Sequence, residues 1–250
     1  MKFSTSIRQR GFTLLETVIA IGVLAVLLTG FMVVFAPAAA GIRKSINVQE
    51  ADRLASTVEQ EMVTFRKGDE SGLPSKTAYT GFDKAYTWIE NSSAAASAIL
   101  VYQYRGELGG TARPDGTPEP VIDVKNKLAG KDYVVVPMAR RVDSANFTKD
   151  IAALEGGVYL VKCTQLVFGG ATAGLTLSTS KKIVDPKGTG GGAVSGTDTY
   201  PEAVIAFAAD FYMLPGKSSS FFGGGSAASY KTAFDKAKTP VFTRNLAVRR

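Results

Sequence analysis

The sequence contains no histidine and a single cysteine, Cys163, among its 250 residues. Histidine is the side chain that titrates near neutral pH and the commonest metal ligand, so its absence excludes histidine-based acid–base catalysis and histidine metal sites. A lone cysteine cannot close an internal disulfide. Because Cys163 lies within the apolar run that starts at Val158, we expect a small buried side chain and not a nucleophile.

The positive charge is weaker than the formal value of +7 suggests. Three of the basic residues, Lys2, Arg8 and Arg10, lie within the first ten positions. Elsewhere no stretch interleaves basic and aromatic residues as a nucleic-acid groove requires, and the Arg249-Arg250 tail is too short to form one. We therefore expect no nucleic-acid partner.

A long uncharged stretch, Thr17 to Ala36, follows this basic start. As a helix rising ~1.5 Å per residue, it would just cross a hydrocarbon core of ~30 Å. Gly22 and Gly30 are typical of membrane helices, where small residues let a neighbouring backbone approach closely. The sequence therefore predicts a transmembrane helix over residues 12–36.

Glu16 lies at the edge of this apolar stretch, where a carboxylate at bilayer depth costs roughly 2.5–3.5 kcal/mol. No lysine or arginine occurs between Gly11 and Ile42, so the helix itself supplies no partner charge. We expect Glu16 to pair with a positive charge from another molecule or with a newly exposed N-terminal amine.

The segment Arg10-Gly11-Phe12-Thr13-Leu14-Leu15-Glu16, with its basic leader and apolar span, resembles the class III signal of type IV pilins and type II secretion pseudopilins. The resemblance implies that residues 1–11 are a leader, which prepilin peptidase removes by cutting between Gly11 and Phe12. It also implies that Phe12 is then N-methylated and that Glu16 guides assembly.

A structural role follows from the same resemblance. The protein would be a subunit of a type IV pilus-like or pseudopilus filament, with sister subunits and prepilin peptidase as partners. It would span the inner membrane once, with an extracytoplasmic head, before entering a filament in the periplasm or at the cell surface. Many major pilins have a disulfide-closed C-terminal loop, which this chain cannot form, so a minor subunit is favoured.

Two alternatives stay open. The small residues from Ala36 to Gly41 fit ordinary signal peptidase cleavage, which would release a protein that starts near Gly41; against it, the apolar region exceeds the usual ~7–15 residues and includes Glu16. The second alternative is an anchored or secreted binding module that does not polymerise. An enzyme is not expected, because no nucleophile and base can be paired.

Beyond the membrane, apolar residues continue at helical spacing. The stripe comprises Ala51, Leu54, Ala55, Val58, Met62 and Phe65. It predicts an amphipathic continuation over residues 37–67, packed on a head formed by residues 68–250. We expect a helix break at Pro37, because proline lacks an N–H and crowds the carbonyl of Val33.

The head is rich in turn-forming residues, with 22 of the 26 glycines and nine of the ten prolines from Gly68 onward. The predicted strands are Ile99–Tyr104, Tyr133–Met138, Val158–Phe168, Ala203–Leu214 and Val241–Val248. Short helices are expected near 147–154 and 227–237. The fold class is thus α+β, with the long helix covering one face of a mainly antiparallel sheet.

The glycine-rich loop from Asp185 to Asp198 has no phosphate-loop spacing. The two aspartates are candidate calcium ligands, but a surface loop without a cofactor is the main expectation. Another loop contains the pair Phe221-Phe222, which could form a subunit contact or pack on the core.

Aromatic residues also recur before and within the first predicted strand. They are Tyr79, Tyr86, Trp88, Tyr102 and Tyr104. Such residues can form a surface that faces a sugar or a protein partner. Alternating aromatics at β-type spacing more often belong to the core, which is the expectation here.

Overall fold

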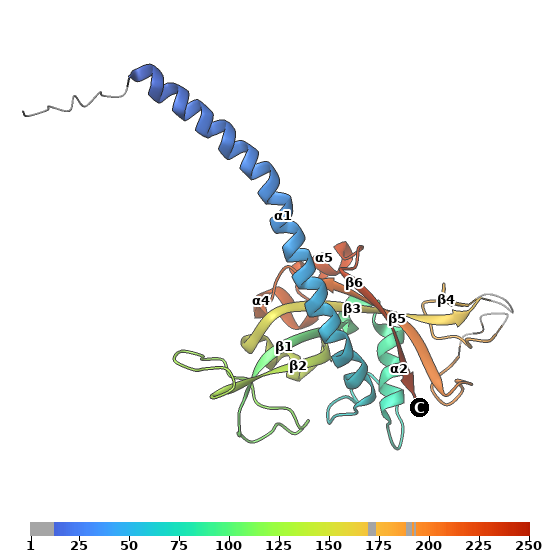
Figure 1. Cartoon of the computed structure of the whole chain (residues 1–250). Coiled ribbons are helices and arrows are strands. Elements are labelled where there is room, and N and C mark those ends of the chain that lie inside the picture. The colour runs from blue at the N-terminus through green and yellow to red at the C-terminus, as the bar shows by residue number, and fades with distance from the viewer. Residues whose placement is uncertain (1–12, 170–173, 189–191, 193) are drawn as a thin grey trace, which may run out of the picture. The chain divides into compact units, whose positions relative to one another are not determined.

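The computed structural model describes residues 13–169, 174–188, 192 and 194–250. The chain divides into two compact units, one ending at Ile46 and the other running from Asn47 to Arg250. Helix α1, Leu14–Val63, includes residues of both units, and all the other elements belong to the second (Figure 1). The predicted α+β class is confirmed.

Helix α1 passes through Pro37 as an α-helix. Proline removes one backbone hydrogen bond, but the hydrogen bonds of the turns on either side hold the helix together. Pro37 therefore does not interrupt the α-helix, so a local loss of helix there is absent, and a kink at this position stays a prediction. The helix ends at Val63, four residues before the predicted end at Lys67, because the following backbone is bound by side chains: the amide of Arg66 donates to Asp69 at 2.8 Å.

The strands form one antiparallel sheet in the order β2-β1-β3-β5-β6, with β4 paired to the end of β3. Their bounds are Ile99–Glu107 (β1), Tyr133–Arg141 (β2), Leu154–Phe168 (β3), Leu175–Leu177 (β4), Val204–Met213 (β5) and Phe242–Arg249 (β6). Each predicted strand is present, with ends within about four residues; β4 was not predicted.

One face of the sheet is covered by the second half of α1 together with α2, Gly81–Asn91. The stripe residues of α1 are at most 1% exposed and pack in the same core cluster as inward-facing strand residues. The shared cluster includes Ala51, Leu54, Ala55, Val58 and Met62 from α1 and Val101, Val161 and Phe207 from the sheet. The amphipathic stripe therefore packs on the head as predicted from Ala51 to Met62, whereas Phe65, its last predicted member, follows the end of α1 and is half-buried.

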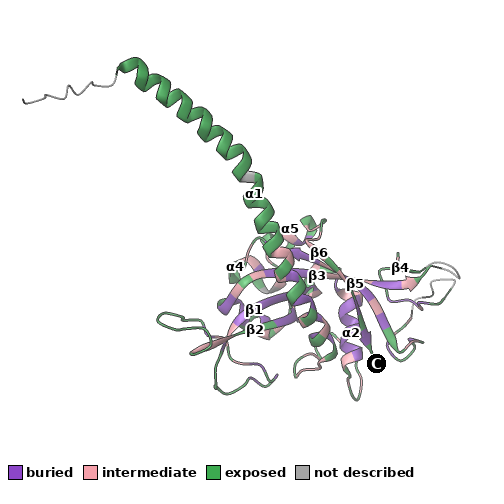
Figure 2. Cartoon of the chain, viewed as in Figure 1, coloured by how far each residue is buried: buried purple, intermediate pink, exposed green. Residues whose placement is uncertain are grey.

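Helices also cover the opposite face; the short helices expected near 147–154 and 227–237 are present, but their packing on a second face of the sheet was not predicted. They are α3 (Ala145–Asp150), α4 (Ser219–Phe222) and α5 (Ala228–Lys236), accompanied by the 3₁₀ turns η1 (Ala95–Ser97), η2 (Ile151–Ala153) and η3 (Gly223–Gly225). Leu100 and Leu160 alternate with the residues of the first cluster and pack with Phe147 and Tyr230 in a second cluster. The head is thus a sheet between two helical layers, buried on both faces (Figure 2).

The prediction that the alternating aromatic residues belong to a strand is wrong for those in helix α2. Tyr86 and Trp88 lie in this helix and not in a strand. It starts at a capping box, in which the hydroxyl of Thr80 accepts from the amide of Asp83 at 3.3 Å, and the Asp83 carboxylate accepts from the amide of Thr80 at 2.9 Å. That capping signal, followed by apolar residues at helical spacing, outweighs the local alternation.

Glu50 fastens α1 to strand β3 at the start of the packed stripe. Its carboxylate accepts from the Tyr159 hydroxyl at 3.0 Å and from the amide of Gly157 at 3.3 Å. Tyr159 is fully buried, and burial, together with the nearby Glu50 carboxylate, raises its pKa. A polar anchor therefore accompanies the apolar contact between helix and sheet.

Buried charges hold the long connection between β1 and β2. Arg140 of β2 donates to Asp115 at 2.7 Å and to Asp150 at 3.2 Å, and Asp150 accepts from Arg113 at 2.8 Å and from the Tyr102 hydroxyl at 2.6 Å. All four charged side chains are at most 5% exposed. Because each carboxylate has several donors, the network fixes the connection to the sheet.

Candidate membrane and assembly helix

The first turn of α1 is capped by Thr13. Its hydroxyl accepts from the amide of Glu16 at 3.3 Å, and its carbonyl accepts from the amide of Thr17 at 3.1 Å. Glu16 lies in this first turn, where a carboxylate interacts favourably with the helix dipole. Gly11 and Phe12, the predicted cleavage junction, lie outside the described residues.

The Glu16 carboxylate makes no hydrogen bond or ion pair within the described part of the chain. The first basic residue after it in the sequence is Arg43, about 40 Å farther along a helix rising ~1.5 Å per residue. The apolar part of the helix therefore contains an acidic side chain, Glu16, and no basic side chain that could pair with it.

The first unit presents an almost continuous apolar surface. Large apolar side chains of residues 14–35 are 50–85% exposed, from Leu28 at the low end to Leu14 at the high end. The helix is long and apolar enough to cross a membrane, with a mean hydropathy of 2.8 over its best window. Exposed apolar surface of this extent is typical of a membrane or protein-binding element.

Polar and small residues within this stretch suit an apolar surrounding. The hydroxyls of Thr17 and Thr29 donate to the carbonyls of Thr13 and Ala25 at 3.1 and 2.8 Å, so neither needs water. Gly30 lies at a shallow hollow formed with Ala25, Val26, Thr29 and Val33. A neighbouring helix can approach closely at such a hollow.

Cys163 is buried in the first core cluster, with 5% of its surface exposed. Burial raises the pKa of its thiol to about 12. Because the thiolate is the reactive form, this side chain is unreactive at neutral pH. The expectation of a small buried side chain is confirmed.

The two aspartates of the predicted calcium loop have separate partners. The Asp198 carboxylate lies 2.9 Å from the Lys76 ammonium group, and the Asp185 carboxylate accepts from the amide of Lys187 at 2.9 Å. Across the described residues no three acidic, cysteine or histidine side chains gather as a metal site. Residues 189–191 and 193 of this loop lie outside the described part, and calcium binding stays a prediction.

The Phe221-Phe222 pair packs on the core, which confirms one of the two alternatives weighed for it. Phe222 is fully buried and meets Phe147 edge-on at 5.0 Å between ring centroids. Phe221 is half-buried against the same cluster. Of the other aromatics expected in the core, Trp88, Tyr102 and Tyr104 are at most 4% exposed and Tyr86 is 5% exposed. Tyr79 is only half-buried, so the expectation of a core position is wrong for this residue.

Comparison with known proteins identifies one feature of the chain. The family described as the prokaryotic N-terminal methylation motif matches residues 7–32. No curated protein and no solved structure matches the chain. The matched segment includes the Gly11-Phe12 junction, Glu16 and most of the exposed apolar surface of α1. The chain therefore carries the N-terminal signature of type IV pilin and pseudopilin precursors.

Proposed function

We propose that this protein is a structural subunit of a type IV pilus-like or type II secretion pseudopilus filament. Prepilin peptidase would remove residues 1–11, leaving an N-methylated Phe12. Before assembly, the apolar part of α1 would anchor the mature chain in the inner membrane, with residues 47–250 on the extracytoplasmic side. It would then join sister subunits in a filament in the periplasm or at the cell surface.

Assembly would rest on packing of the apolar helices and on one charge pair. The Glu16 carboxylate of one subunit would pair with the Phe12 amine of its neighbour. In a low-dielectric surrounding such a pair is strong, and an unpaired carboxylate is costly. The requirement for a partner would therefore fix the axial register between neighbouring helices.

One observation carries this proposal: the methylation motif coincides with Glu16, which has no partner among the described residues and lies in the first turn of an exposed apolar helix. The hollow beside Gly30 supports helix packing at close range. Within the family a minor subunit is favoured, because Cys163 is the only cysteine and no disulfide can close a C-terminal loop.

The test compares Glu16→Ala with Glu119→Ala, which removes an exposed carboxylate in the head. Both variants should reach the membrane fraction and lose the leader, as intact mass and the N-terminal peptide will show. Only Glu16→Ala should be missing from sheared filaments. Normal incorporation of this variant would exclude the charge pair. A start near Gly41 or an uncut Met1 would instead favour a binding module that does not polymerise.

A further inference from the structure

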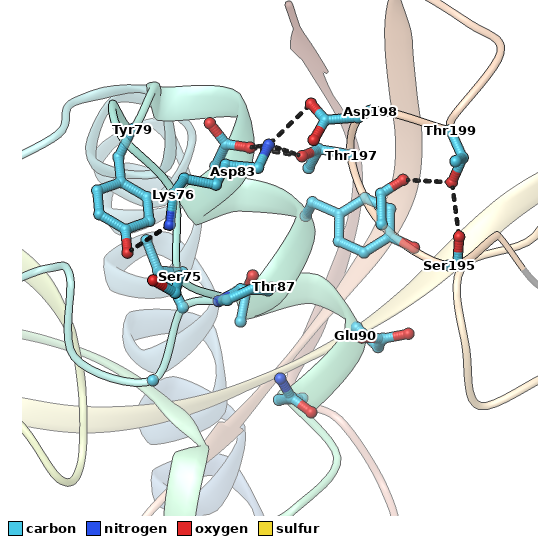
Figure 3. A pocket seen from close by; sticks show the side chains of 16 residues that line it. Ser75, Lys76, Tyr79, Asp83, Thr87, Glu90, Ser195, Thr197, Asp198 and Thr199 are labelled. Atoms are coloured by element: carbon cyan, nitrogen blue, oxygen red, sulfur yellow. Dashed lines mark hydrogen bonds and ion pairs between the residues drawn. The ribbon is translucent and has the colours of Figure 1, made fainter.

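The head contains a cavity of mixed polar and apolar lining that filament assembly does not require. Its volume is about 630 Å³, within the range of ~300–1,000 Å³ typical of small-molecule sites. Its walls come from residues 72–76, from the start and end of the α2 region, and from residues 195–199 (Figure 3). Hydroxyl, amide, carboxylate and phenol groups line it together with apolar surface from residues such as Leu73 and Pro74.

A charge cluster holds the cavity walls together. The Lys76 ammonium group lies 2.6 Å from the Asp83 carboxylate, 2.6 Å from the Thr197 hydroxyl and 2.9 Å from the Asp198 carboxylate. The Tyr86 hydroxyl donates to the carbonyl of Val194 at 3.0 Å. The 195–199 loop is thus attached to α2, and the cavity is formed without a ligand.

Thr87 contributes a free hydroxyl to the cavity wall. It is 5% exposed and lines the cavity, yet its hydroxyl has no hydrogen-bond partner in the described chain. Helical threonines commonly donate to the carbonyl four residues earlier, whereas this hydroxyl makes no such bond and is accessible from the cavity. The hydroxyl is therefore available for an external partner.

Glu90 and Asn91 supply further free groups at the same end of α2. Within the described residues neither side chain makes a hydrogen bond, and both line the cavity. Figure 3 shows Thr87 and Glu90 on the cavity-facing side of the helix. A carboxylate, an amide and a hydroxyl together offer both acceptors and donors to a ligand that carries several hydroxyl groups.

Tyr79 provides an apolar wall whose orientation is fixed. Its ring stacks on Phe65 with 5.7 Å between centroids and 11° between planes, and its hydroxyl accepts from the amide of Lys76 at 3.2 Å. The side chain is half-buried and lines the cavity. A held aromatic ring is a suitable surface for the C–H groups of a flat, amphipathic ligand.

The charged residues that line the cavity limit the chemical class of ligand that it can bind. Lys76 is paired with both Asp83 and Asp198, so together with Glu90 the described lining holds three carboxylates against one cation. An anionic ligand would be repelled, and an apolar one would leave Thr87 and Glu90 unsatisfied. We propose that this cavity binds a neutral saccharide, with Glu90, Asn91 and Thr87 contacting its hydroxyls and Tyr79 packing against a sugar ring.

The experiment uses the full chain in a zwitterionic detergent, because glucoside and maltoside detergents carry sugars that would compete. Galactose, N-acetylglucosamine, lactose and cellobiose are titrated as probes, with saturation-transfer NMR and change in melting temperature as readouts. At least one should bind. Glu90→Gln and Thr87→Val should each weaken that binding, by roughly tenfold for Glu90, because charged hydrogen bonds are the stronger ones.

Matched control variants distinguish a loss of binding at the cavity from a general loss of folding. Glu119→Gln and Thr111→Val make the same chemical changes at exposed positions and should bind as the unchanged protein does. N-acetylarginine amide is titrated as a cationic peptide probe. No binding of any sugar, equal binding by the Glu90 and Thr87 variants, or binding of the arginine probe alone would each overturn the proposal. None of these outcomes depends on filament assembly.

Discussion

The ammonium group of Lys84 lies 2.7 Å from the carbonyl oxygen of Thr64, directly after the last residue of α1. The lysine is 1% exposed, and its second partner is the Asp69 carboxylate, also at 2.7 Å. Its charge also lies 4.5 Å from the centre of the Trp88 ring. A buried cation on α2 thus satisfies a carbonyl beyond the end of α1, where a positive charge is favourable.

Replacing this lysine should destabilise the head. Lys84→Met keeps the length of the side chain but leaves the Thr64 carbonyl without a donor and the Asp69 carboxylate without its cation, so we expect a loss of about 2–4 kcal/mol in the free energy of unfolding. Urea unfolding followed by near-ultraviolet circular dichroism measures it. Adding Asp69→Asn should recover part of the loss, since the uncompensated carboxylate is then removed. A change below about 0.5 kcal/mol would contradict the capping role.

Acid should weaken the head through Asp115. Burial alone raises the pKa of this carboxyl, but hydrogen bonds from Thr117 and Arg140 outweigh it and hold the pKa at about 2. Because the pKa is lower in the folded chain than its usual value near 3.9, the stabilisation is complete above about pH 4 and is lost as the pH falls toward 2.

Thr117→Val isolates this effect, because it removes the hydroxyl that donates to Asp115 at 2.7 Å. The pKa of Asp115 should rise, and the free energy of unfolding at pH 7 should fall by about 1–2 kcal/mol. The loss on acidification from pH 7 to 2 should then be smaller than in the unchanged protein. Thr111→Val, an exposed position, serves as the control. Parallel pH profiles for the two variants would rule out the role of Thr117.

The two phenylalanines at the end of α4 should differ in their effect on stability. Phe222→Ala removes a fully buried ring and should cost about 3–5 kcal/mol. Phe221→Ala should cost less, because Phe221 is half-buried. If Phe221→Ala instead lowered stability more than Phe222→Ala, or if it reduced filament formation without changing stability, the pair would act as a subunit contact. Thermal unfolding of the purified variants decides between these outcomes.

The thiol of Cys163 should be protected in the folded chain. Its burial and its pKa of about 12 predict no reaction with Ellman's reagent at pH 8. One thiol per chain should react once urea unfolds the head. Labelling within minutes in native conditions would show that strand β3 opens locally far more often than its buried position predicts.

Strong local signals made α1 and the sheet predictable. The stripe from Ala51 to Met62 repeats at helical spacing, and runs such as Tyr133–Met138 lie between clear turn residues. Such patterns depend on neighbours in the chain. The methylation motif is equally local, which is why Gly11, Phe12 and Glu16 could be proposed from sequence alone.

The cavity and the buried charges could not be predicted in the same way. Lys76 meets Thr197 across 121 positions, and Arg113 meets Asp150 across 37. No spacing rule links residues so far apart. Helix α2 was missed for another reason: its aromatic residues alternate like a strand, and only the capping box from Thr80 to Asp83 indicates a helix start.

The attachment of α1 to the head has a mechanical consequence. Within the second unit, the stripe residues of α1 enter the core side by side, and Glu50 adds a polar anchor to β3 at the upstream end of the stripe. A pull along the helix axis would have to slide every one of these side chains out of close packing at once. The contact is loaded in shear and cannot open one residue at a time, so the head should resist detachment from its helix under tension.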